Sequence, residues 1–385
     1  MKNKIIAVGP TTQNNTVLSG QTMMFQLFVD TVHARKMRLI IVDIGISIFK
    51  KLEKRVSGKF SILRAVNYSV ILVKFFFILL FNPKQTVYIT TAQSKVGFVR
   101  DYFIINLAKF FGCKIIAHQF GANYGGFYNS QSDFVKNLIV KTFYKTDRII
   151  VEGDYTKKQF DFLPDYQTKV YSLPNGLPEK VDSSEICAKT LDQNSPIQLF
   201  YLSNLIESKG FWDVLEAVNI LVNTYEMEIS AVFSGKFLDA VDDTKFKSGE
   251  EARKAFFDYI EKHDLERSIT YYEGLYGVDK SKEFKKSHFF LLPSYYINEG
   301  QPVSVLEALA YGCVPIVTEY RLITTMVNQK NGFFVNPKSP NEIANIVKEM
   351  STKPEVYTRY SQEAIDYYLN NFTAEKYTNH LISLL

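Results

Sequence analysis

The sequence has few cysteines, and they are not spaced like disulfide partners or metal ligands. Cys113, Cys187 and Cys313 are the three thiols in 385 residues, and they lie far apart in the chain. This spacing predicts neither a disulfide framework nor a zinc site, and it favours a reducing cytoplasm.

Two ligand-binding motifs are also missing. No Gly-x-Gly-x-x-Gly follows the first predicted strand, which argues against a dinucleotide-dependent oxidoreductase. No Asp-x-Asp metal motif follows a strand, because the pair Asp242 and Asp243 falls in a polar loop. We therefore expect no bound metal and no cofactor.

No hydrophobic run is long enough to cross a membrane. The best candidate, Val70 to Phe81, has twelve residues and contains Lys74, whereas a spanning helix needs about 20 apolar residues. The basic residues just before it are Lys50, Lys51, Lys54, Arg55, Lys59 and Arg64. This pattern fits a protein held on an anionic bilayer surface, and the alternative is a core-packed helix with a solvated basic face. We predict a cytoplasmic protein and hypothesise a peripheral contact with the inner face of the plasma membrane.

A strong charge of one sign is absent as well. The net charge is +5, and no nucleic-acid-binding motif or Lys/Arg-dense arm accompanies it, so we expect no nucleic acid partner. The apolar fraction of 46% and the charged fraction of 22% are those of a folded globular protein. The length suits two domains, each with its own core.

Short apolar runs rich in β-branched residues alternate with amphipathic stretches along the whole chain. The predicted strands of the first half are Lys4–Val8, Arg38–Asp43, Thr86–Thr91, Lys114–His118 and Arg148–Glu152. Those of the second half are Ile197–Ser203, Ile229–Ser234, Ile269–Glu273, Phe289–Pro293, Val314–Thr318 and Gly332–Asn336. This alternation predicts two α/β domains with doubly wound parallel sheets.

The domain boundaries follow from the polar stretch in the middle of the chain. We predict an amino-terminal Rossmann-like domain over residues 1–180, a linker over 181–196 and a carboxy-terminal Rossmann-like domain over 197–353. Residues 354–385 are expected to form two helices that return to the amino-terminal domain. Domains of this kind bind ligands at the carboxyl ends of their strands, so we expect the site in a cleft where those ends face each other.

The segment from His288 to Thr318 is the richest in chemistry. It predicts a buried strand, a loop, a helix that begins at Pro302 and ends at Gly312, and another strand. The N–H groups of Val303 and Ser304 would open that helix, an arrangement that receives phosphate. Glu299 precedes the helix and Glu307 lies within it, and such acceptor-only carboxylates suit hydroxyls on either side of a diphosphate. The segment thus predicts a nucleotide-sugar site, in which Gly300 and Gln301 belong to the loop.

This segment resembles the E-x7-E signature of glycosyltransferase family 4, which has the GT-B fold of two Rossmann-like domains facing across a cleft. The resemblance implies that residues 1–180 form the acceptor-binding domain and residues 197–353 the nucleotide-sugar-binding domain. It also implies that Glu299 contacts hydroxyls of the donor sugar and that Glu307 contacts the ribose. A second similarity lies around Ser203-Asn-Leu-Ile-Glu-Ser-Lys-Gly210, where the family's lysine neutralises the donor diphosphate. Here that residue is Lys209. The family's usual arginine is replaced by Asn204, and Lys280 and Lys282 are candidates for the missing cation.

Three further resemblances extend the site. Tyr272-Glu-Gly274 looks like the family's strand end near the nucleotide base, which implies a donor contact for Gly274. His118, at the end of a predicted strand, resembles the family's histidine near the donor sugar. Gly20 stands where relatives use a glycine pair for close backbone approach to the donor or acceptor.

The resemblance implies a retaining, metal-independent glycosyltransferase with Glu299, His118 and Lys209 as catalytic residues. Its expected partners are a UDP- or GDP-sugar donor and a glycan or lipid-linked oligosaccharide acceptor, in the synthesis of a bacterial surface polysaccharide such as capsule, O-antigen or exopolysaccharide. Two alternatives stay open. One is a nucleotide-sugar 2-epimerase of the same fold, and the other is a non-catalytic nucleotide-sugar-binding protein.

Overall fold

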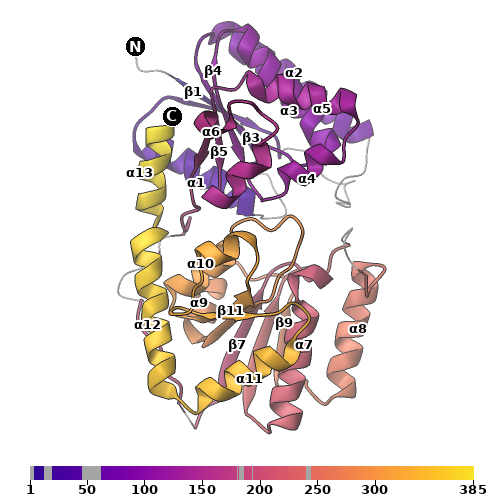
Figure 1. The fold of residues 1–385 in the computed structure, drawn as a ribbon, viewed down its shortest axis with the longest axis vertical. Helices are drawn as coiled ribbons and strands as arrows, with labels where there is room; N and C mark the ends of the chain where they lie inside the picture. The colour runs from indigo at the N-terminus through magenta and orange to yellow at the C-terminus, as the bar shows by residue number, and fades with distance from the viewer. Residues whose placement is uncertain are drawn as a thin grey trace. The chain divides into compact units, whose positions relative to one another are not determined.

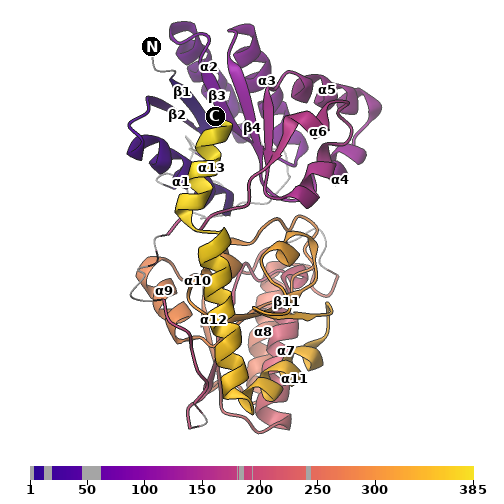
Figure 2. The same cartoon turned by 60° about the vertical axis from the view of Figure 1, so that its left-hand side comes forward.

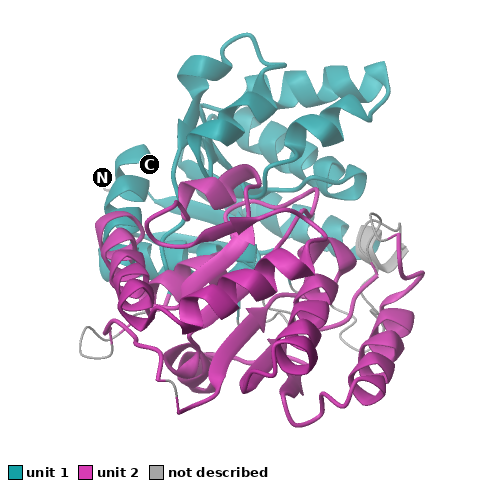
Figure 3. Cartoon of the chain, turned by 60° about the horizontal axis from the view of Figure 1, so that its bottom comes forward, with its two compact units in different colours: residues 1–178, 374–385 teal, residues 179–373 magenta. Residues whose placement is uncertain are grey.

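The computed structural model describes residues 4–12, 20–45, 62–179, 181, 186–192, 194–239 and 244–385, with no side chains described for 62–65. The chain divides into two compact units (Figure 3). Unit 1 contains Met1–Pro178 and Ala374–Leu385, and unit 2 contains Glu179–Thr373. The basic segment of the membrane hypothesis, from Lys50 to Lys59 with the Arg64 side chain, lies outside the described residues, as do Asp242 and Asp243.

Unit 1 is built on a six-stranded parallel sheet with the order β2-β1-β3-β4-β5-β6. Its strands are β1 (Ile5–Gly9), β2 (Leu39–Asp43), β3 (Thr86–Thr91), β4 (Lys114–Gln119), β5 (Arg148–Val151) and β6 (Val170–Ser172). Strands β1 and β3 are buried along their whole length and β4 is buried except at Lys114, as expected for a parallel sheet covered on both faces.

Helices cover both faces of this sheet (Figures 1 and 2). The unit's helices are α1 (Gly20–Ala34), α2 (Ile62–Phe81), α3 (Lys95–Phe110), α4 (Tyr124–Asn129), α5 (Asp133–Tyr144), α6 (Tyr166–Lys169), the 3-10 helix η1 (Asp154–Phe160) and α13 (Ala374–Leu384). One continuous core joins α2, α3 and α5 to alternate strand residues such as Val87 and Ile89. Tyr88 points to the opposite face, where its ring stacks on Phe28 of α1.

The last helix of the chain, α13, belongs to unit 1 although about 200 residues of unit 2 precede it. Its buried side chains are Tyr377, Leu381 and Leu384, and it packs beside α1. Arg148 donates from Nη1 to the carbonyl oxygen of Leu384 at 2.7 Å. A cation at the carboxyl end of a helix also stabilises the helix dipole, so the tail is fixed by packing and by charge.

Unit 2 repeats the plan with the strand order β12-β11-β10-β7-β8-β9, again all parallel. Its strands are β7 (Ile197–Leu202), β8 (Ile229–Ser234), β9 (Ile269–Tyr272), β10 (Phe289–Leu292), β11 (Val314–Thr318) and β12 (Phe333–Val335). Its helices are η3 (Glu207–Lys209), α7 (Phe211–Asn219) with the π-turn η4 (Ile220–Thr224), α8 (Gly249–Lys262), α9 (Gly277–Lys286), α10 (Val303–Ala310), η5 (Arg321–Thr325), α11 (Pro340–Ser351) and α12 (Pro354–Asn371).

The structure differs from the predicted domain limits at two places. The segment expected to be a linker is part of unit 2, because Leu191 is buried there and the Lys189 ammonium donates to the carbonyl oxygens of Phe284 and Ser287. Of the two terminal helices, only α13 joins unit 1. Helix α12 stays in unit 2, where it packs on α10 and the Ser361 hydroxyl donates to the carbonyl of Gly312 at 2.7 Å.

The apolar run considered for a membrane span is the second half of α2. Within the described ranges, no helix combines the length and the hydrophobicity that crossing a bilayer requires.

The packing of α13 leads to a stability prediction. Leu381→Ala removes a fully buried side chain and should lower the opening free energy of the unit 1 strands by about 2–4 kcal/mol. Hydrogen exchange of the strand amides measures each unit separately. Ser383→Ala, on the exposed side of the same helix, is the matched control and should change little. An equal loss of protection in both units would contradict the assignment of α13 to unit 1.

Candidate functional site

The predicted site residues of unit 2, except Gly274, lie in the segments that follow the two strands between which the strand order of its sheet reverses. Strands β7 and β10 are neighbours, but the chain continues from β7 to β8 on one side and from β10 to β11 on the other. The loops that leave their carboxyl ends therefore diverge and leave room at this point of the sheet edge. Open α/β sheets bind their ligands at such a switch point.

The loop after β7 brings Lys209 to this point. Its turn η3 is followed by Gly210 in the left-handed conformation, with φ +80°. A Cβ atom on Gly210 would lie 2.6 Å from the carbonyl oxygen of Pro293, just after β10. Glycine is thus required twice, by the backbone angle and by the close approach of the two loops.

Glu207 holds the same loop from its other side. Its buried carboxylate accepts hydrogen bonds from the N–H groups of Thr244 and Lys245, both at 2.6 Å. Burial alone would raise the pKa of Glu207, but these backbone donors hold it below its usual range. Glu207 is therefore an anionic anchor for the backbone and not a ligand-binding group.

The loop after β10 supplies Glu299, which is 4% exposed. The Lys209 ammonium lies 2.8 Å from each oxygen of the Glu299 carboxylate. The Ser294 hydroxyl also donates to Glu299, and the Lys209 ammonium lies 4.9 Å from the centre of the Tyr296 ring. The two predicted catalytic residues of unit 2 are thus in direct contact, within a cluster that shields their charges from bulk water.

Helix α10 follows this loop with the predicted limits. Pro302 is its N-cap residue, and Gly312 ends it with φ +66°. The N–H of Gly312 donates to Leu309 and that of Cys313 donates to Ala308, which is the Schellman arrangement. At the other end, the N–H groups of Val303 and Ser304 have no acceptor within the helix. Gly300 and Gln301 lie in the connection just before it, with Gln301 buried.

Glu307, on α10, is bound by one of the two lysines proposed for the missing cation. The Lys280 ammonium lies 2.5 Å from Glu307 and 2.8 Å from Glu179. Burial raises the pKa of Glu307, although Lys280 opposes the shift. Burial would lower the pKa of Lys280, but the two carboxylates outweigh this effect and raise it, so the lysine stays charged. Lys282 is exposed and faces Asp279, which leaves Lys280 as the cation next to a predicted site residue.

Two other predicted donor residues of unit 2 lie beside this cluster without joining it. Asn204 is exposed in the loop after β7. Gly274 follows β9, two strands away from β7, where the next N–H, of Leu275, donates to Ser234 at 2.9 Å.

The remaining predicted residues, His118 and Gly20, belong to unit 1. Gly20 is the exposed first residue of α1. His118 lies inside β4 and is fully buried, with its Nδ1 2.6 Å from the Tyr88 hydroxyl and its ring stacked on Phe120. Its Nε2 is buried and has no hydrogen-bond partner among the residues that the structure describes. Burial lowers the pKa of His118 to about 3, so the imidazole is neutral at physiological pH.

Three residues of the cluster had not been identified from the sequence. Ser294 and Tyr296 stand in the segment that we singled out, directly after β10, and that position is the signal that could have found them. Glu179 stands at the start of the polar central stretch and reaches Lys280 only in the folded chain.

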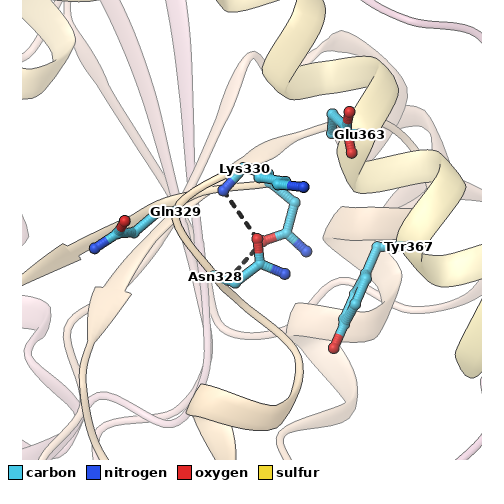
Figure 4. A pocket seen from close by; sticks show the side chains of 6 residues that line it. Asn328, Gln329, Lys330, Glu363 and Tyr367 are labelled. Carbon is cyan, nitrogen blue, oxygen red and sulfur yellow. Dashed lines mark hydrogen bonds between the residues drawn. The ribbon is translucent and has the colours of Figure 1, made fainter.

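A separate hollow of unit 2 contains none of the predicted residues. It lies between the loop before β12 and helix α12 (Figure 4). The residues that line it are Asn328, Gln329, Lys330, Asn331, Glu363 and Tyr367. Asn328 and Asn331 bind backbone groups of their own loop, so these side chains shape a turn.

Comparison with known proteins finds similarity to glycosyl transferases. Residues 182–367 match the family model described as "Glycosyl transferases group 1". No curated protein matches the chain. Among solved structures, the Anabaena HepE complex with UDP aligns with a TM-score of 0.71 and 13% identity, over 99% of each chain. Sucrose-phosphate synthase from Thermosynechococcus elongatus aligns with a TM-score of 0.70 and 13% identity, over 99% of this chain and 98% of the other.

The two parallel sheets and these alignments confirm the predicted GT-B architecture. Residues 182–367, which include the switch-point cluster of unit 2, are similar to the group 1 glycosyl transferases.

The Lys280 contacts generate a prediction for unit 2. Lys280→Met leaves Glu307 as a buried, unpaired charge and should lower the opening free energy of the unit 2 strands by about 3 kcal/mol at pH 8. The second change Glu307→Gln should restore most of this loss, since it removes the charge. Hydrogen exchange of the strands gives both values. Lys282→Met is the control on the same helix, because its exposed ion pair contributes little. Equal losses for both lysines would refute the assignment.

His118 generates a pH prediction for unit 1. Its folded pKa lies below the unfolded value of 6.5, so the stability it contributes is present above pH 6.5 and is lost as the pH falls toward 3. Between pH 7.5 and 5.5 the wild type should lose about 1.4 kcal/mol more than His118→Gln. Exchange of the unit 1 strand amides, corrected for the intrinsic rate, measures the difference. The exposed His33→Gln should follow the wild type, and a pH response of His118→Gln equal to that of the wild type would exclude a buried neutral imidazole.

Proposed function

We propose that the protein is a retaining, metal-independent glycosyltransferase of family 4 that uses a nucleotide diphosphate sugar as donor. The observation that carries the proposal is the Lys209–Glu299 contact at the switch point of unit 2, just before the amino end of α10. A cation, a carboxylate and free helix N–H groups in one place match the diphosphate and the hydroxyls of such a donor.

Each group has a distinct part in the proposed reaction. The bond between the anomeric carbon and the diphosphate breaks, and negative charge grows on the leaving nucleotide diphosphate. Lys209 and the N–H groups of Val303 and Ser304 stabilise that charge, and interactions that strengthen in the transition state raise the rate. Glu299 accepts hydrogen bonds from sugar hydroxyls. The acceptor oxygen attacks from the face that the diphosphate leaves, which retains the configuration.

The nucleoside end of the donor is assigned to the Glu307–Lys280 pair. A carboxylate held by a buried lysine offers a fixed acceptor for the two ribose hydroxyls. Lys280 also adds a positive charge that Asn204 cannot supply. The solved HepE structures contain UDP, UDP with glucose, or UDP-glucose, which favours a uridine nucleotide over GDP for this chain too.

The first unit completes the proposal. His118 is assigned to the donor sugar, and Gly20 is assigned to backbone contacts with the donor or acceptor. The acceptor is a glycan or a lipid-linked oligosaccharide. The neutral imidazole would act through its unpartnered Nε2 as a hydrogen-bonding group and not as a cation. The expected setting is the assembly of a bacterial surface polysaccharide, for which we expect a cytoplasmic enzyme.

Glu299→Gln tests the proposed reaction. The change keeps the shape of the side chain but removes its charge and half of its acceptor capacity, so turnover should fall by about 10² to 10³. Sugar transfer from UDP-sugars to an acceptor panel is the measurement, with thermal unfolding as a check on folding. Glu266→Gln, an exposed carboxylate of the same unit, should transfer like the wild type.

Three outcomes would contradict the proposal. Unchanged transfer by Glu299→Gln would remove the catalytic role of that residue. Epimerised sugar nucleotide in a reaction without acceptor would identify an isomerase. If a nucleoside diphosphate raised the melting temperature strongly while no donor was consumed with any acceptor, the protein would be a binding protein.

A further inference from the structure

Helix α2 has an apolar face that the rest of unit 1 leaves exposed. Val66, Val70, Val73, Phe77 and Leu80 recur at intervals of three and four residues, which places them along one side of the helix. Phe77 keeps 53% of its surface exposed. The opposite side holds buried residues of the sheet core, so this helix is apolar on both sides.

Helix α3 continues the same face. Val99, Phe103 and Phe110 follow the helical repeat and are exposed, with Phe103 at 49%. The two helices lie side by side on one face of the sheet (Figures 1 and 2), and the Phe76 and Phe111 rings meet edge to face at 5.7 Å. Together these residues of α2 and α3 form one surface, which we call the α2–α3 face. Monomeric soluble proteins rarely leave large contiguous apolar patches exposed, and such patches mark interaction sites.

The exposed charged side chains described on α2 and α3 are all positive. From residue 54 to residue 132 the sequence contains one acidic residue, Asp101, which is buried and paired with Arg100 at 2.6 Å. Lys74 on α2 and Lys95 on α3 are exposed, and the exposed Lys109 of α3 lies 3.8 Å from the Asp147 carboxylate. The basic segment that precedes α2 in the sequence has the same sign.

Exposed apolar side chains beside positive charges favour one kind of partner for this face over another. A second copy related by a two-fold axis would place the same lysines opposite one another, and like charges disfavour such an interface. An anionic bilayer instead offers apolar chains to the phenylalanines and negative headgroups to the lysines. Amphipathic helices with a basic rim lie in that interface without crossing it.

We propose that the α2–α3 face binds the surface of an anionic lipid bilayer. The inference adds to the proposed function, in which the acceptor can be lipid-linked. A protein held on the bilayer encounters such an acceptor by diffusion within the plane of the membrane. The contact itself involves no residue of the donor site.

Vesicle flotation of the full chain tests the proposal. The wild type should float with vesicles of phosphatidylcholine and phosphatidylglycerol at low salt, but not with phosphatidylcholine alone. The double change Phe77→Ser and Phe103→Ser removes two exposed rings and should weaken partitioning at least about tenfold. Lys74→Glu with Lys95→Glu should weaken it similarly, and so should added salt, because salt screens the charges. Tyr155→Ser, 63% exposed elsewhere in unit 1, is the matched control and should float normally.

Other results would count against bilayer binding or against the proposed function. A wild type that stays unbound, or a phenylalanine variant that floats like the wild type, would overturn the proposal. A wild type that sediments as a dimer and is made monomeric by the phenylalanine changes, without vesicle binding, would assign the face to a second copy. The shift in melting temperature caused by UDP, measured on all variants, reports on the donor site alone. Its absence in the wild type would count against the proposed function and not against bilayer binding.

Discussion

The close approach of two loops at the switch point of unit 2 is the constraint on which the candidate site depends. Gly210 lies against Pro293 because it has no side chain, and this contact sets the loop after β7 beside the loop after β10. Lys209 and Glu299 can then pair at 2.8 Å. Glu207 fixes the first loop from behind, and Ser294 and Tyr296 surround the pair from the second. The charged groups are therefore held by backbone packing and not by their mutual attraction alone.

Most of the fold could be predicted from the sequence, because buried parallel strands read as continuous apolar runs. All eleven predicted strands occur within a residue or so of their limits, whereas β6 was missed because three residues carry no periodicity. The limits of the units could not be predicted in this way. Lys189 and Leu191 stand in a polar stretch, and only the carbonyl groups and the core that receive them make that stretch part of unit 2.

The candidate site was predictable where its residues share one local segment. Glu299, Val303, Ser304 and Glu307 follow from a strand, a loop and a capped helix, and the structure has these elements. Partners that come from distant segments could not be found, as with Glu179 at Lys280 and Tyr88 at His118. The sequence also left Lys280 and Lys282 equivalent, although they differ by half a helical turn. Burial distinguishes them, because one faces α10 and the other faces solvent.

The position of α13 has a consequence for synthesis of the protein on the ribosome. Unit 2 is a continuous segment of the chain, so it can reach its native fold as soon as residue 373 has left the exit tunnel. Unit 1 cannot, because Tyr377, Leu381 and Leu384 are made only after the whole of unit 2, and they cover the α1 side of its sheet. The first half of the chain must therefore wait, with apolar surface exposed, until α13 has been synthesised. Chaperone binding to ribosome-held chains should accordingly be strongest on the half that is synthesised first.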